Sequence, residues 1–248
     1  MVLRSVAHLA TFALVHWMLH GKPQAPTPTP KELARILAIA AALAMIPSFD
    51  PGLFSLAVPC ALPAIWILFW LAQAFTSPTT LPASFWILAW GMSVAVPVSL
   101  FGQLELDALG GAQDPFWAVI LQPVAFVFAA SSLAVWFQAT PEASFSPRTA
   151  DGLLGGLLVS VTVVVFLGAW HVPGVSDDAI TSALGSRLAV FVSFAVFVVK
   201  CIGVAFLLTR GRVARILSKP RWNASQLCAL SAANLVLTWI VLAVRGAG

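Results

Sequence analysis

Lys200 is the residue of this sequence whose type and position could best support chemistry. It lies in the apolar run FAVFVVKCIGVAFLL, thirteen residues after Arg187 and ten before Arg210, and ten helical residues span about 15 Å. A lysine at the centre of a membrane span costs about 2.5 to 3.5 kcal/mol, so it normally faces a bundle interior or an aqueous cavity and has a function. The alternative is snorkelling of the long side chain toward an interface. Because no carboxylate lies at that depth, its partner must be a hydroxyl, a carbonyl, water or another subunit.

A second group of reactive side chains follows a predicted span end, where His171 precedes Asp177 and Asp178. This group is the only polar constellation that would suit a membrane enzyme acting on lipid, but a lone His beside Trp170 is typical of an interfacial residue. The three cysteines share no pair spacing and lie in or beside apolar segments: Cys60, Cys201 and Cys228. No Gly-rich phosphate loop, CxxC pair, HExxH motif or nucleophile elbow occurs. The sequence therefore predicts no catalytic residue and no metal site.

The composition requires a membrane around these residues. Of 248 residues, 60% are hydrophobic and 9% are charged, against roughly a quarter charged in a soluble domain. All nine acidic residues fall in or beside the breaks between apolar runs, and the Lys and Arg residues cluster in connecting segments. The formal charge of +4 is thus explained by membrane orientation and not by nucleic acid. We expect an all-α integral membrane protein.

Seven apolar segments are long enough to be transmembrane helices, because a span needs about 20 mostly apolar residues. They are 34–49, 53–75, 83–101, 116–139, 152–170, 187–209 and 224–244. Starting from a cytoplasmic segment at residues 21–35, this register places nine of the thirteen Lys and Arg residues on the cytoplasmic side, and only Arg187 and Arg245 opposite. That asymmetry agrees with the positive-inside rule.

The N-terminal region predicts an interfacial helix followed by a connector. Residues 1–22 form the predicted amphipathic helix, with Arg4, His8 and His16 along one stripe. An eighth span and a signal peptide are the alternatives. Residues 23–32 form a Pro/Thr-rich connector, extended over 23–30, and 33–248 form the transmembrane domain.

Small residues and prolines inside the spans indicate a packed bundle. Gly152, Gly155 and Gly156 form a face that lets another helix approach closely. Pro97 and Pro123 interrupt the backbone hydrogen bonds of their predicted spans, which is tolerated where neighbouring helices satisfy the freed groups.

Several stretches follow one another in an informative order. Residues 166–170 read FLGAW at a span end, a span containing Lys200 comes next, and residues 220–227 read PRWNASQL. Upstream, residues 121–126 read LQPVAF and residues 102–107 read GQLELD. In order and spacing they resemble the membrane protein of respiratory complex I known as subunit 1, whose relatives anchor membrane-bound hydrogenases and formate hydrogenlyase.

This resemblance covers residues 33–248 and implies a multi-pass subunit of the bacterial inner membrane. It would link the peripheral redox arm of a complex I-type, NADH:quinone oxidoreductase-like machine to ion-translocating subunits. The implied partners are antiporter-like membrane subunits, a peripheral iron–sulfur subunit and the lipid bilayer, with no nucleic acid. No cofactor is implied for this chain alone, and quinone at an interface is left open. The chain would be non-catalytic or would contribute to a quinone site.

The departures from the family pattern are as informative as the matches. The long acidic cytoplasmic loop of the family is shortened here to residues 140–151, and its intramembrane glutamates have no counterpart. Asn223 and Ser225 replace the family's Arg and Asp. A proton relay needs titratable groups within reach of one another, so these losses favour a scaffold with a reduced proton path.

Six residues are the resulting site candidates. Lys200 is expected to lie on an ion path inside the bundle. The others are expected to be docking residues or remnants of the quinone loop on the cytoplasmic face: Glu142, Arg148, Asp151, Arg221 and Gln226. The basic cluster at 210–221 would bind anionic lipid or an acidic partner, or would only set the topology.

Three other functions remain open. One is the membrane anchor of a hydrogenase-type complex. Another is a stand-alone transporter of ions or small molecules, although the two halves of the chain lack the similarity that many transporters show. The third is the lipid-directed enzyme built on His171.

Overall fold

The computed structural model describes residues 10, 13–14, 29–44, 81–113, 116–139, 150–172, 174–210, 215–216 and 223–246. Within these residues every regular element is an α-helix, which confirms the predicted class at that level. The helices are α2 (Pro30–Ala44), α4 (Leu81–Phe101), α5 (Leu106–Gly111), α6 (Ala118–Leu121), α7 (Pro123–Ala139), α8 (Ala150–Leu167), α9 (Asp177–Thr209) and α11 (Ala224–Gly246).

Three of these helices, α8, α9 and α11, are long and apolar enough to cross a membrane. They correspond to the predicted spans 152–170, 187–209 and 224–244. Shorter apolar helices cover Phe85–Phe101 and Pro123–Gln138. The predicted span 53–75 and the end of the span 34–49 lie outside the described residues. The chain is thus a multi-pass helical protein.

The predicted span 116–139 is not one continuous helix. It divides at Gln122, whose φ of −132° and ψ of 59° are not helical, into the four-residue α6 and the longer α7. Pro123 explains the break, because proline lacks an N–H and disfavours the helical conformation in the residue before it.

Two other boundaries differ from those expected. α8 ends at Leu167 and not at residue 170, since Gly168 and Ala169 have φ values of 64° and 48°. Such left-handed backbone ends a helix, and glycine adopts it without strain. At the other end of the chain α2 begins at Pro30, so the last three residues of the expected connector belong to this helix. Of the rest of the connector the structure describes only Thr29, and nearly all of the predicted amphipathic helix 1–22 lies outside the described residues.

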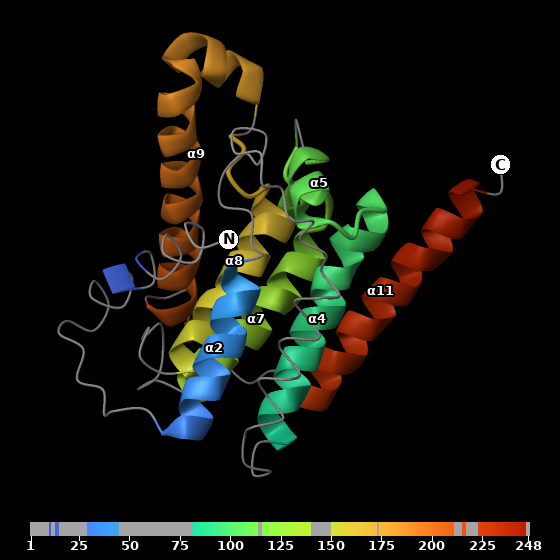
Figure 1. Cartoon of the computed structure of the whole chain (residues 1–248). Helices are drawn as coiled ribbons and strands as arrows, with labels where there is room; N and C mark the ends of the chain where they lie inside the picture. The colour runs from blue at the N-terminus through green and yellow to red at the C-terminus, as the bar shows by residue number, and fades with distance from the viewer. Residues whose placement is uncertain are drawn as a thin grey trace.

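The described long helices run in the directions that the predicted register requires. In Figure 1, α2, α4, α8 and α11 begin at one end of the bundle, whereas α7 and α9 run the opposite way. α9 is bent at Gly185, where φ is 76° and ψ is 156°, and its first part lies across the top of the long part. The predicted span 187–209 starts just after this bend.

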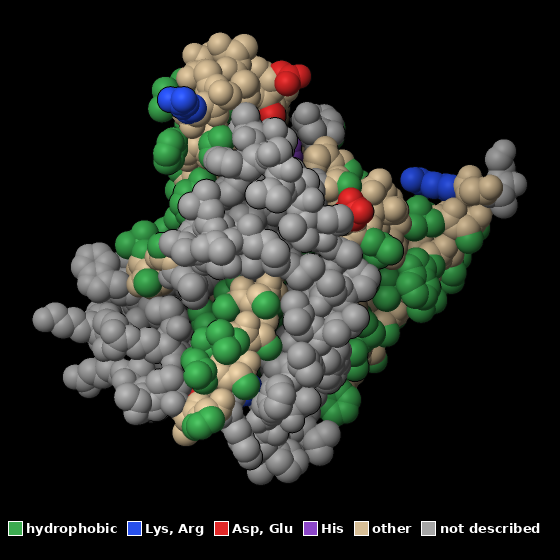
Figure 2. Space-filling model, viewed as in Figure 1, with side chains coloured by type: hydrophobic (Ala, Val, Ile, Leu, Met, Phe, Trp, Pro, Cys, Tyr) green, Lys and Arg blue, Asp and Glu red, His purple; other side chains and the backbone are tan. Residues whose placement is uncertain are grey.

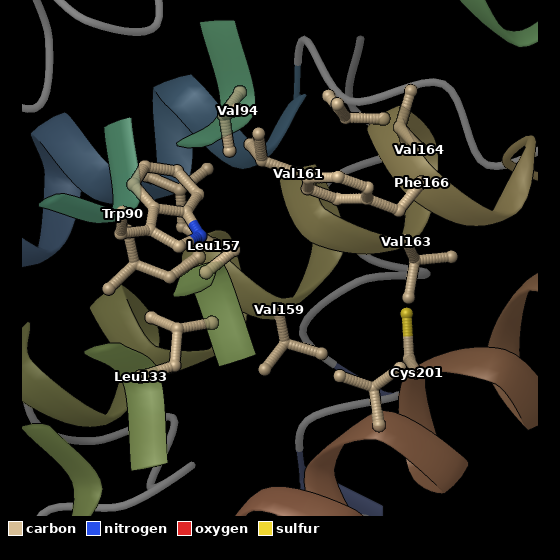
Figure 3. Packing of buried hydrophobic residues seen from close by; sticks show 14 of the residues in the cluster. Trp90, Val94, Leu133, Leu157, Val159, Val161, Val163, Val164, Phe166 and Cys201 are labelled. Atoms are coloured by element: carbon tan, nitrogen blue, oxygen red, sulfur yellow. The ribbon is translucent and has the colours of Figure 1, made fainter. Parts of the chain in front are cut away.

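α8 is the central helix of the bundle. Buried residues make up 89% of its most apolar 18-residue stretch, against 28% for α9 and 17% for α11. It contacts α2, α4, α5, α7 and α9. Figure 3 shows the core around it, with Cys201 of α9 pointing toward Val163 of α8. α9 and α11 are therefore peripheral helices that leave much apolar surface for lipid or partners.

Close packing and buried hydrogen bonds fix the neighbours of α8 and α4. A Cβ atom at Gly155 would lie only 2.7 Å from Cε1 of Phe137, so the expected small face does receive another helix, α7. The Trp90 indole of α4 donates a 3.0 Å hydrogen bond to the Thr162 hydroxyl of α8. The hydroxyls of Ser93 on α4 and Ser231 on α11 are 3.1 Å apart.

Candidate functional site

The Lys200 ammonium is bound by backbone carbonyls at the C-terminal end of α8. Its Nζ donates hydrogen bonds of 2.6, 2.9 and 2.6 Å to the carbonyl oxygens of Leu167, Ala169 and His171. An ammonium has three N–H donors, so its hydrogen-bonding capacity is filled. The last carbonyls of a helix lack partners within it and carry its partial negative charge. We call this arrangement the Lys200 cap.

The sequence at the end of α8 makes the three carbonyls converge. After Leu167 the chain turns through two residues with positive φ, Gly168 and Ala169. This turn ends the helix and brings the carbonyls of alternate residues to one side, where α9 presents the lysine. The FLGAW stretch and Lys200 therefore form one structural unit.

A short segment between α5 and α6 closes the other side of the Lys200 cap. The ammonium lies 4.6 Å from the centre of the Trp117 ring, a distance suited to a cation–π interaction. Gly168 is packed against the same ring, because a Cβ there would lie 3.1 Å from Cδ1 of Trp117. Gln113 is 2% exposed, and its amide donates to the Val164 carbonyl at 2.8 Å and accepts from Ala118 N–H at 3.0 Å.

The Lys200 ammonium lies near one end of the bundle and not at its middle. α9 begins beyond the end of α8 (Figure 1), so the ammonium lies level with the point at which α8 stops. Of the four kinds of partner that the sequence allowed, the structure supplies carbonyls. Counting along α9 alone gives the depth of the residue within its own helix, but not its level relative to the neighbours.

His171 and Asp177 lie beside the Lys200 cap. His171 Nδ1 is 3.1 Å from Asp177 Oδ2, and the Trp170 indole donates to the same oxygen at 3.2 Å. His171 Nε2 is buried and has no hydrogen-bond partner within the described residues. Asp178 is exposed. The contacts attach the turn after α8 to the first turn of α9.

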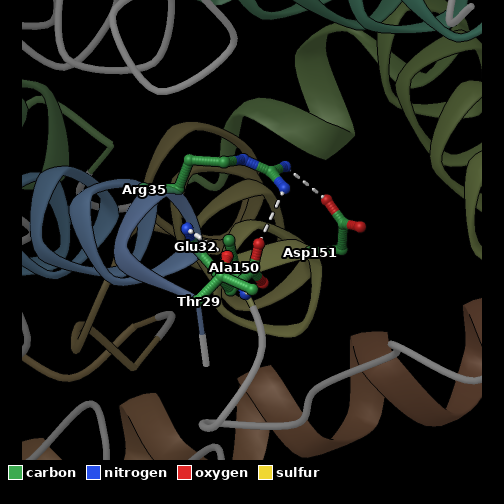
Figure 4. Close-up of polar contacts among 5 residues, drawn as sticks. All are labelled: Thr29, Glu32, Arg35, Ala150 and Asp151. Atoms are coloured by element: carbon green, nitrogen blue, oxygen red, sulfur yellow. Dashed lines mark hydrogen bonds and ion pairs between the residues drawn. The ribbon is translucent and has the colours of Figure 1, made fainter. Parts of the chain in front are cut away.

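A second polar cluster lies at the opposite end of α8, where α2 begins (Figure 4). Arg35 donates from Nη2 to Asp151 Oδ1 at 2.7 Å and from Nη1 to Glu32 Oε2 at 3.2 Å. The other Glu32 oxygen accepts from Ala150 N–H at 2.8 Å, at the start of α8. Asp151, expected to be a docking charge, is thus bound within the chain. Sequence reasoning missed Arg35 and Glu32, since residues separated by more than one hundred positions carry no pairing signal.

The Arg35–Asp151 pair predicts a measurable coupling between α2 and α8. In a double-mutant cycle with Arg35→Met and Asp151→Asn, we expect a coupling energy of about 1 kcal/mol, the upper end for exposed ion pairs. The Arg35 side chain is 11% exposed but that of Asp151 is 40% exposed, so solvent screens the pair. Unfolding of the purified chain in detergent measures this energy, and additive effects of the two substitutions would contradict it.

Gln226 is a helix-capping residue in the structure. Asn223 Oδ1 accepts from Gln226 N–H at 2.8 Å, and Gln226 Oε1 accepts from Asn223 N–H at 3.0 Å. This reciprocal pair is a capping box at the start of α11, and the spacing N-x-x-Q could have indicated it. Ser225 donates to the same Asn223 oxygen at 2.8 Å. The candidates Glu142, Arg148 and Arg221 lie outside the described residues.

The two polar clusters hold neighbouring elements of the bundle together. The Lys200 cap and the Arg35 cluster occupy opposite ends of α8 and share no residue. Among the described residues no group of three or more His, Cys, Asp or Glu side chains could hold a metal ion. Cys201 is buried and Cys228 is half-buried, both as free thiols.

The chain is similar in structure to a chain of a solved membrane complex. No model of a known protein family matches the chain, and no curated protein matches it. A chain in the structure of the membrane-bound sulfane sulfur reductase, described as an archaeal respiratory membrane complex, matches with 14% sequence identity. The match covers 94% of this chain and 96% of that chain, with a TM-score of 0.45.

Proposed function

We propose that this chain is a membrane scaffold subunit of a complex I-type energy-converting complex. The observation that carries the proposal is the Lys200 cap. The FLGAW stretch and the span lysine are the two most distinctive features of the resemblance to the complex I membrane protein, and they are thirty residues apart in sequence. Their direct contact through Leu167, Ala169 and His171 supports treating them as one inherited unit.

The bonding of the charged groups favours a scaffold over a proton path. Lys200 donates to carbonyls, which do not titrate, and Asp151 is paired with Arg35. A relay needs His, Asp or Glu side chains in succession through the membrane. In the proposed role, α8 is held at both ends, while the apolar faces of α9 and α11 contact lipid and neighbouring subunits.

The proposed partners follow from this role. They are antiporter-like membrane subunits on one side and a peripheral iron–sulfur subunit on the cytoplasmic face, in the bacterial inner membrane. The chain holds no redox cofactor of its own in this proposal, and quinone would bind only at an interface that other subunits complete.

Purification from native membranes tests the proposal. We expect the chain, carrying an N-terminal affinity tag and extracted in a mild detergent, to retain antiporter-like subunits and an iron–sulfur protein identified by mass spectrometry. A tagged unrelated membrane protein from the same cells is the control for non-specific retention. Recovery of the chain alone, as a monomer or homo-oligomer, would contradict the proposal and favour a stand-alone transporter. Recovery of the chain with a hydrogenase would identify it as the membrane anchor of a hydrogenase-type complex.

A further inference from the structure

The last turns of α11 diverge from α4 beyond Trp239, whose indole donates a 2.8 Å hydrogen bond to Ser99 of α4, and a groove lies between the two helices. Toward its C-terminus α11 moves away from α4 in Figure 1, and apolar side chains cover its visible side in Figure 2. The groove has a volume of about 500 Å³ and is bounded by the end of α4, the α6–α7 break and α11. Leu100, Leu121 and Val241 are among its apolar walls.

Polar side chains lie within these apolar walls. Gln122 lines the groove at the α6–α7 break, Asn234 lines it from α11, and Arg245 lies in the last turn of α11. The Asn234 Nδ2 is buried without a hydrogen-bond partner among the described residues. An unpaired amide is costly where hydrocarbon replaces water. A lipid acyl chain has no hydrogen-bonding group, so an acyl chain in the groove would leave the Asn234 amide unpaired.

The spacing on α11 is that of a helix-packing seam. Asn234, Thr238, Val241 and Arg245 all line the groove, at intervals of four, three and four residues. Intervals of this kind place side chains on one face and are those by which helices interlock in coiled coils. Arg245 is eleven residues beyond Asn234, which is about 16 Å along the helix.

We propose that this groove receives one transmembrane helix of another subunit. That helix carries a hydrogen-bonding side chain opposite Asn234 and an acidic side chain near its outer end opposite Arg245, about eleven residues apart. Interhelical hydrogen bonds from Asn are a recognised means of association in membranes, and either end of the amide can face the partner after a flip. The inference rests on the proposed function in expecting another subunit of the same complex.

Photocrosslinking in native membranes tests the inference. A photoreactive amino acid is placed at Val241, which is 46% exposed in the groove, or at the control position Val236, which is 50% exposed. Val236 lies nine residues before Arg245, on the opposite face of α11. We expect the Val241 probe to label one transmembrane segment of another chain, with an acidic residue near its outer end. Labelling of lipid alone, or of a second copy of this chain, would overturn the inference.

Charge reversal tests the chemistry of the contact. Arg245→Glu should lower the yield of the Val241 crosslink about tenfold, and a basic residue in place of the partner's acid should restore it. Arg187→Glu, which reverses an exposed cation on α9, should leave the yield unchanged. An Arg245→Glu chain that crosslinks as well as the parent would overturn the acidic pairing.

The two proposals can fail separately. If the energy-converting subunits co-purify but the Val241 probe labels only lipid, the groove inference fails and the proposed function stands. If the probe labels a matching helix of a protein that belongs to no energy-converting complex, the groove inference stands and the proposed function fails.

Discussion

Lys200→Met is expected to destabilise the folded chain by about 3 kcal/mol or more. Removing the ammonium leaves the carbonyls of Leu167, Ala169 and His171 without their donor. Each buried acceptor left unpaired costs about 1 to 3 kcal/mol, and hydrogen bonds to a charged group lie at the upper end of the range. The cost of burying the ammonium is removed at the same time, which offsets part of the loss. Unfolding of the purified chain in detergent micelles measures the difference.

Two matched variants give this expectation its control. Lys200→Arg keeps the charge and N–H donors, so it should lie between the parent and Lys200→Met in stability. Arg187→Met removes an exposed cation from the same helix and should change stability by less than about 0.5 kcal/mol. A Lys200→Met chain as stable as the parent would show that the carbonyls need no donor from α9.

The same variant separates the scaffold from an ion path. In the assembled complex, a scaffold role expects Lys200→Met to reduce the amount of complex recovered while turnover and proton movement per complex stay unchanged. A loss of proton movement at full turnover and full assembly would instead place Lys200 on the path.

Gly155→Ala is the second change expected to have a large effect. An added Cβ would lie 2.7 Å from Cε1 and 3.2 Å from Cζ of Phe137, and 3.2 Å from Trp136. Both aromatic side chains are nearly fully buried, at 3% and 4% exposure, so neither can move aside without disturbing the core. Overpacking of this kind costs about 1 to 3 kcal/mol. We expect the upper part of that range, measured as a lower unfolding free energy in detergent.

Gly203→Ala is the matched control for this substitution. A Cβ at Gly203 of α9 would meet no atom within 4 Å, and the residue is exposed. Replacing a glycine inside a helix by alanine favours the helix by about 0.5 to 1 kcal/mol, so this variant should be neutral or slightly more stable. Equal effects of the two substitutions would mean that α7 and α8 do not pack closely at Gly155.

The described helices could be predicted from the sequence because each feature that defines them depends on residues close together in the chain. Apolar length, the placement of acids in breaks and the glycine face of α8 all depend on neighbours within a few residues. The division of the predicted span 116–139 is local too, since Pro123 acts on Gln122, but apolar length alone predicts one continuous helix there. The early end of α8 at Leu167 is signalled by Gly168, which has positive φ.

The candidate site could be predicted only in part, for a physical reason. The sequence identifies Lys200 by the cost of its charge, since lysine in an apolar run is conspicuous. Its acceptors are backbone carbonyls, which every residue possesses, so no residue type indicates them. Gln113 and Trp117 escape sequence reasoning because their roles depend on the path of a short segment between helices. Arg35 and Asp151 are paired across more than one hundred residues, and only the packing of α2 on α8 brings them together.

The order of helices around α8 has a consequence for the time course of assembly. α2, α4 and α7 precede α8 in the chain, whereas Lys200 comes thirty-three residues after Leu167. During synthesis the carbonyls at the end of α8 therefore have no contact with the Lys200 ammonium until α9 has entered the membrane. We expect the contact to be absent from the folding transition state of the complete chain as well, so that its removal speeds unfolding and leaves the folding rate unchanged. We expect Lys200 to determine how long the assembled bundle persists, as the unfolding rate of Lys200→Met in detergent would reveal.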